Sequence, residues 1–232
     1  MPRIKHPITP AATLACLLLL AALPATADHW CGENGVIRFS FVEGPELQPV
    51  LQAEPDSNGL TMVDLWVWLT DVEPMTLNGE AILATGGFEL ELVVEGAEAF
   101  VQGKEFPGQG INVARDAWGC ILGLNPNPRF SDGRTLLVKY SLLFQGRPQN
   151  VRFSLRDEAI ISCGRIEGCS GSGTKALWIG PYDADMLSEV WGAGCAPAWL
   201  NPTGEPDLTP ERGSSGWRDV GRCQPRTERG AG

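Results

Sequence analysis

Short segments in which apolar and polar residues alternate recur along the middle of this chain. From Val63 to Leu69 every second residue is aliphatic, and the same alternation returns from Phe88 to Val94 with glutamates between the apolar positions. Successive residues of a β-strand point to opposite faces of a sheet, so this pattern predicts strands with one buried face. Two further segments show the alternation, Val36–Val42 and Val151–Leu155.

Leu136–Phe144 differs from these segments because it is apolar on both faces apart from Lys139 and Ser141. A strand of that kind is typical of the middle of a sheet. Turn-forming pairs such as Asn58-Gly59 separate the strands, and no long amphipathic helix is visible. Many short strands without long helices predict an all-β fold, an antiparallel β-sandwich.

The N-terminal segment has the composition of an export signal. A basic start precedes an apolar run at residues 11–23, and Ala25-Thr26-Ala27 then has the small-x-small pattern of a signal peptidase site. The run is shorter than the roughly 20 residues that span a bilayer. We therefore expect residues 1–27 to be a signal peptide and the remaining chain to be secreted, periplasmic or extracellular, without membrane insertion after cleavage.

Residues 28–200 then form the expected sandwich domain. Beyond residue 200 the composition shifts to Pro, Gly, Ser, Arg and Glu with few large apolar side chains. This shift predicts a mostly irregular C-terminal extension at residues 201–232, tethered through Trp217 and Cys223.

The strand order between Thr61 and Cys163 resembles a known family. The segments Val63–Leu69, Gly86–Leu92 with its Gly-Gly-Phe-Glu-Leu-Glu-Leu sequence, Leu136–Leu143 and Val151–Leu155 follow one another, with a Gly/Pro loop before the last two. This order is similar to that of the immunoglobulin-like sandwiches of secreted bacterial cohesins and carbohydrate-binding modules. The resemblance implies an immunoglobulin-like fold, on the scale of one such domain. No binding residue matches by motif, and the cysteines and the C-terminal extension depart from a typical cohesin.

The net charge of −10 at pH 7 disfavours nucleic acid and anionic lipid as partners. Of the seven cysteines, Cys16 lies in the signal, and six in an exported protein predict a disulfide framework. The sequence leaves their pairing open. The six cysteines are Cys31, Cys120, Cys163, Cys169, Cys195 and Cys223.

Histidine is scarce, since only His29 follows the signal. This disfavours Ser-His-Asp and Cys-His catalysis and most zinc sites. We therefore expect no catalytic residues. The 28 acidic residues leave a carboxylate-dependent hydrolase such as a glycosidase as one alternative, and a purely structural extracellular role as another.

Asp183 and Asp185 place two carboxylates two residues apart, and Glu189 follows four residues later. Hard oxygen ligands of this kind suit Ca²⁺. The same aspartates suit the N-cap of a short helical turn that continues through Val190 and Trp191, and the sequence favours this cap over calcium. Calcium is the one cofactor that we consider.

The chain has eight tryptophans, and Trp66 and Trp68 lie two residues apart on one predicted strand. Their rings therefore share a face at a spacing of roughly 7 Å. On an exposed face they would stack on sugar rings or seat an apolar side chain of a partner. Because large aromatic residues are usually buried, a core role under another segment is the competing interpretation. The resulting hypothesis is a non-catalytic binding or adhesion module for glycan or protein partners at the cell surface.

Overall fold

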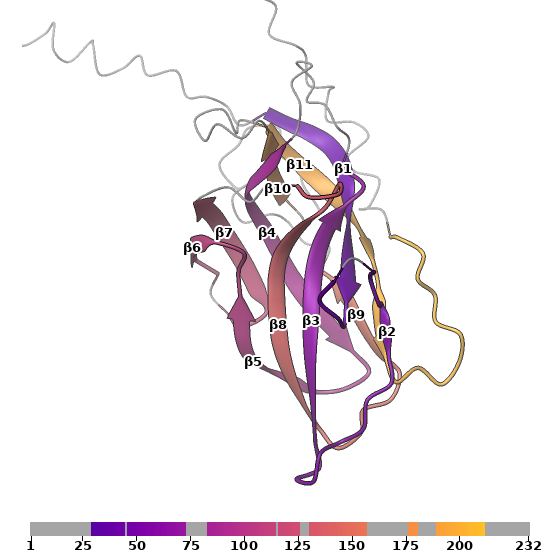
Figure 1. Cartoon of the computed structure of the whole chain (residues 1–232). Helices are drawn as coiled ribbons and strands as arrows, with labels where there is room; N and C mark the ends of the chain where they lie inside the picture. The colour runs from indigo at the N-terminus through magenta and orange to yellow at the C-terminus, as the bar shows by residue number, and fades with distance from the viewer. Residues whose placement is uncertain are drawn as a thin grey trace, which may run out of the picture.

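The computed structural model describes residues 29–44, 46–72, 83–114, 116–125, 130–156, 176–180 and 189–211. Every regular element in these residues is a β-strand (Figure 1). No helix in this part of the chain is long and apolar enough to cross a membrane. The strands are β1 (His29–Ser40), β2 (Val50–Leu51), β3 (Leu60–Thr70), β4 (Ala84–Glu95), β5 (Ala99–Glu105), β6 (Gln109–Asn112), β7 (Gly119–Asn125), β8 (Thr135–Gln145), β9 (Val151–Leu155), β10 (Ala176–Gly180), β11 (Glu189–Ala196) and β12 (Ala198–Leu200).

The strands form two sheets that share β4. One sheet has the order β5-β8-β3-β1-β11-β10-β4-β7-β6, and the other has the order β4-β9-β12-β2. Figure 1 shows β3 and β8 side by side, with β4 and β9 behind them. Most neighbours are antiparallel, but β11 is parallel to β1 and β12 is parallel to β2. The all-β prediction is confirmed, whereas a wholly antiparallel immunoglobulin-like order is not.

The interior lies between the two sheets, at the apolar positions of the alternating segments. Val63, Leu65, Val67 and Leu69 of β3 are all buried. Phe153 of β9 contacts two other phenylalanines edge to face, with 5.7 Å between its ring centre and that of Phe41 and 6.4 Å to that of Phe144. These contacts pack residues from both sheets against one another in the interior.

β8 pairs with β3 on one side and β5 on the other, so the predicted central position of this strand is confirmed. Glu89 departs from the alternating pattern, since it is buried on β4 between β7 and β10. The predicted helical turn is wrong for Glu189, Val190 and Trp191, which belong to β11. Pairing of β11 with β1 satisfies the backbone there and overrides the local helical signal. Asp183 and Asp185 lie outside the described residues.

The predicted disulfide framework is not supported. Cys120 is a free thiol buried on β7, where its Sγ lies 3.1 Å from the Tyr140 hydroxyl. Cys195 is likewise buried, on β11, and Cys31 lies on β1. The other three predicted cysteines, Cys163, Cys169 and Cys223, lie outside the described residues.

Residues 201–211 follow an irregular course beside the sheets. The Trp199 indole nitrogen donates to the Asp207 carbonyl at 2.9 Å, and the Glu211 backbone exchanges two hydrogen bonds with Cys195. Arg152 of β9 also forms an ion pair with the Glu211 carboxylate. The predicted signal peptide and the rest of the extension, including Trp217, lie outside the described residues, so these boundaries stay predictions.

Candidate binding surface

Trp66 and Trp68 lie on the outward side of β3, because the residues between and beside them point into the core. Residues directly opposite in paired strands point to the same face, so β8 and β5 continue this surface. We call it the tryptophan face. It consists of Met62, Asp64, Trp66 and Trp68 of β3, Leu136, Lys139, Ser141 and Leu143 of β8, and Phe100 and Glu105 of β5.

Trp66 is half-buried under a cation. Its direct partner on β8 is Lys139, whose ammonium lies 5.2 Å from the centre of the Trp66 ring. The same ammonium forms ion pairs with Glu105 at 3.1 Å and Asp64 at 3.2 Å. Hydrogen bonds to Glu105 and Asp64 raise the pKa of Lys139, so this side chain keeps its charge over the aromatic ring.

Trp68 has a similar arrangement at the next outward position of β3. The Arg134 guanidinium carbon lies 5.1 Å from the centre of its ring. The indole N–H of Trp68 is buried and has no hydrogen-bond partner within the described part of the chain. The prediction that both rings share one face is confirmed. The two tryptophans are neither open platforms nor core residues, since each is half-buried beside a cationic side chain.

The most exposed apolar side chains of the tryptophan face lie at its other end. Met62 is 68% exposed and Phe100 is 51% exposed. Both are register partners of the half-buried Leu143, from β3 and β5 respectively. These three residues therefore form an apolar row across three neighbouring strands. Between this row and Trp66, the Ser141 hydroxyl donates to the Asp64 carboxylate at 2.6 Å.

Sequence reasoning missed this row. Met62 continues the outward series of Asp64 and Trp66 at the same spacing of two, and this was a usable signal. Phe100 carried no such signal, because the segment around it does not alternate and its strand is recognised only through pairing with β8.

The predicted calcium ligands are not brought together by anything described. Asp183 and Asp185 fall outside the described residues, and Glu189 lies on β11. Within the described ranges, no group of three His, Cys, Asp or Glu side chains is arranged to hold a metal ion. Calcium binding by these three residues stays a prediction.

Comparison with known proteins gives a limited result. No protein-family model matches the chain, and no curated protein matches it. Among solved structures, the chain is similar to the seventh ScaB type I cohesin from Pseudobacteroides cellulosolvens, with a TM-score of 0.41 and 9% sequence identity. The match covers 78% of this chain and 97% of the cohesin chain. We transfer no residue role or partner from it.

Proposed function

We propose that this chain is a secreted, non-catalytic binding module that engages a protein partner through the tryptophan face. The observation that supports this proposal is the apolar row of Met62, Leu143 and Phe100. Single exposed apolar residues are common on protein surfaces and need no explanation. Here two exposed residues, Met62 and Phe100, lie in register with the half-buried Leu143 across three strands, on one side of two tryptophans and their cations.

The composition of the face favours a protein over a glycan as the partner. Sugar rings stack on open aromatic faces, whereas Trp66 and Trp68 are half-buried with a cation close to each ring. Methionine, tryptophan and arginine are enriched in protein interfaces, and the flexible Met62 side chain adapts to an apolar partner surface. The charged group of Asp64, Glu105 and Lys139 then provides a polar border beside the apolar row.

The test compares two double variants of equal charge change. Met62→Glu with Phe100→Glu alters the apolar row, whereas Ile111→Glu with Val113→Glu alters residues that are 80% and 63% exposed on and beside β6. Alanine at Trp66 and Trp68 is a poorer test, since both rings contribute to packing. The purified secreted chain and both variants are immobilised and exposed to the extracellular fraction of the source organism, and bound proteins are quantified by mass spectrometry.

A protein that the parent chain and the β6 variant retain, and that the apolar-row variant loses, is then purified and its direct affinity measured by calorimetry. We expect the row variant to weaken that affinity by at least about tenfold, as loss of a central apolar contact does. Equal affinity of the parent and the row variant contradicts the proposal. Saturable binding on a glycan array, with no direct protein binding, would support the glycan alternative instead.

A further inference from the structure

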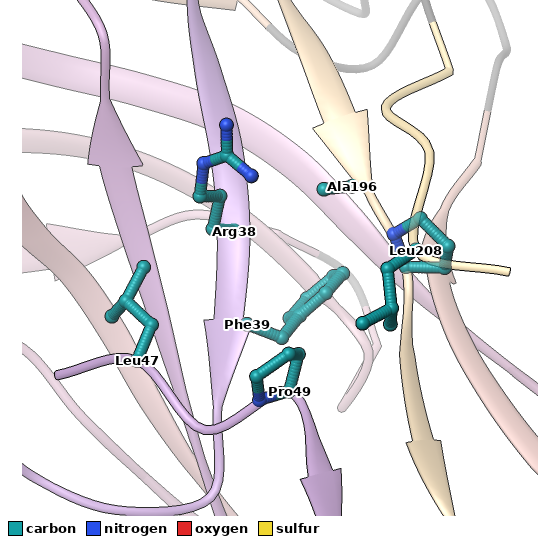
Figure 2. A pocket seen from close by; sticks show the side chains of 7 residues that line it. Arg38, Phe39, Leu47, Pro49, Ala196 and Leu208 are labelled. Atoms are coloured by element: carbon teal, nitrogen blue, oxygen red, sulfur yellow. The ribbon is translucent and has the colours of Figure 1, made fainter. Parts of the chain in front are cut away.

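A hollow of about 320 Å³ opens beside β1 (Figure 2), and one of its lining residues, Arg38, is the register partner of Trp68. It lies where the backbone pairing of β1 with β11 ends. The last register pair between β1 and β11 is Arg38 with Ala196, whereas at Phe41 the backbone N–H donates instead to Gln48 at 2.9 Å. The backbone pairing along this edge of β1 is therefore interrupted between Arg38 and Phe41. Side chains surround the space that this interruption leaves.

The walls of the hollow are almost entirely apolar. Phe39, Leu47, Pro49, Ala196 and Leu208 contribute, from β1, the β1–β2 connection, β11 and the segment after β12. Figure 2 shows Phe39 between Leu47 and Leu208, with Pro49 at one end of the group and Arg38 at the other. Among the described residues that line the hollow, Arg38 is the only charged one.

The Arg38 guanidinium is held in place by its neighbours at the end of β3. Its Nε donates to the Thr70 hydroxyl at 3.2 Å, and its Nη2 donates to the Asp71 carboxylate at 2.9 Å. Its Nη1 makes no hydrogen bond to any described residue. The Arg38 side chain is 36% exposed, so this nitrogen can donate to a further acceptor.

We propose that the hollow binds a small apolar carboxylic acid. Its apolar part would contact Phe39, Leu47 and Leu208, and its carboxylate would accept a hydrogen bond from Arg38 Nη1. The volume lies at the lower end of the range for small-molecule sites, which combine apolar walls with a few placed polar groups. A carboxylate is the preferred acceptor for a guanidinium because the hydrogen bond is charge-assisted. Asp71 is 59% exposed, so solvent screens its repulsion of such a ligand.

The test is an NMR titration of the isotope-labelled secreted chain with 4-phenylbutyrate. Two control probes separate the parts of the ligand: 4-phenylbutanol has the apolar part without the charge, and acetate has the charge alone. We expect saturable shifts of the Leu47, Ala196 and Leu208 amides with 4-phenylbutyrate. The alcohol should bind about fivefold more weakly, since the ion pair is partly exposed to solvent, and acetate should cause no saturable shift.

Arg38→Gln should reduce the affinity for 4-phenylbutyrate to that for the alcohol and leave the alcohol unchanged. Arg147→Gln is the matched control, because Arg147 is also exposed and pairs with Glu54 at 3.0 Å, outside the hollow. Leu208→Trp should fill the hollow and abolish binding of both aromatic probes. The proposal is overturned if these amides show no saturable shift with 4-phenylbutyrate, or if acid and alcohol bind the parent chain equally.

Discussion

The ammonium of Lys139 lies over the indole ring of Trp66, 5.2 Å from the ring centre, with the two residues facing each other across β8 and β3. Strand register alone brings them together, since they are 73 residues apart in sequence. The contact covers a ring that would otherwise be open to stacking. It also connects Trp66 to Asp64 and Glu105 through the ion pairs of Lys139, so the aromatic and charged parts of the face form one network.

Replacement of Trp68 by phenylalanine should leave stability unchanged or raise it by up to about 1 kcal/mol. The indole N–H of Trp68 is buried and without a partner in the described chain, and a buried unsatisfied donor costs free energy. Trp66→Phe is the matched control, and we expect it to lower stability slightly because it only removes packed ring area. Urea unfolding measures the stability of both variants. A larger loss of stability for Trp68→Phe than for Trp66→Phe would contradict the prediction.

Two glycines that are register partners on neighbouring strands should differ sharply in their tolerance of alanine. A Cβ at Gly87 of β4 would overlap with the carbonyl oxygen of Leu122, whereas a Cβ at Gly123 of β7 meets no atom within 4 Å. We expect Gly87→Ala to lower the free energy of unfolding by about 1–3 kcal/mol and Gly123→Ala to change it by less than about 0.5 kcal/mol. Thermal unfolding of the two variants tests this, and equal midpoints would show that β4 and β7 are not paired as described.

Asn201 is a buried polar residue on which two segments depend. Its backbone has a φ of 48°, and its side-chain oxygen accepts from the Ala53 N–H at 2.7 Å. Its side-chain nitrogen donates to the carbonyls of Ala53 and Pro148 at 3.0 and 2.8 Å. Asn201→Ala should therefore lower the free energy of unfolding by about 2–4 kcal/mol. It would leave the Ala53 N–H and the carbonyls of Ala53 and Pro148 without these hydrogen bonds, and it would place alanine at a strained φ.

The control for Asn201 is Asn150, which has a similar φ of 52° but an exposed side chain. Asn150 accepts from the Thr203 N–H and hydroxyl, so its loss also removes hydrogen bonds. Since water can replace those bonds, Asn150→Ala should cost about 1 kcal/mol. Urea unfolding measures the loss of stability in both variants. Equal losses for Asn201→Ala and Asn150→Ala would mean that the burial of Asn201 does not determine how much it stabilises the fold.

The Cys120–Tyr140 pair predicts loss of stability at alkaline pH. Burial raises the pKa of the Cys120 thiol above its ordinary value of 9.0 and the pKa of the Tyr140 hydroxyl well above 10.0. The folded chain therefore holds both groups neutral. Their contribution to stability is complete below about pH 9 and declines as pH rises further, because only the unfolded chain then releases the protons. Urea unfolding at a series of pH values should show that the free energy of unfolding declines less steeply above about pH 9 for Cys120→Ala than for the parent chain. Equal declines would show that Cys120 does not contribute to the loss of stability at alkaline pH.

Local alternation was sufficient to predict the strands that have one buried face. The predicted bounds of Val151–Leu155 agree with β9, and the segment Val63–Leu69 lies within β3. The period of two survives in such strands because one side packs against the opposite sheet. β5, β6 and β12 were not predicted, since they are short or carry mixed residues and depend on hydrogen bonds to distant strands.

The tryptophan face was likewise predicted in part from the sequence, and the rest of it follows from the tertiary structure. The pattern of β3 places Trp66 and Trp68 on one face, but their partial burial follows from Lys139 and Arg134 on and beside β8. Phe100 and Leu143 become neighbours only through the register of β5 with β8. Cys120 was expected in a disulfide, whereas the fold places its thiol beside the Tyr140 hydroxyl in the core.

By itself, the sequence determined which side of each alternating strand is apolar, and hence that the chain folds as packed β-sheets. This information is local, because the alternation of side chains is a property of the extended backbone. Only the tertiary structure decided the register between strands, the parallel pairing of β11 with β1 and the exposure of each outward side chain. These features depend on hydrogen bonds and contacts between residues that are far apart in the chain, and a single local pattern is compatible with many such arrangements.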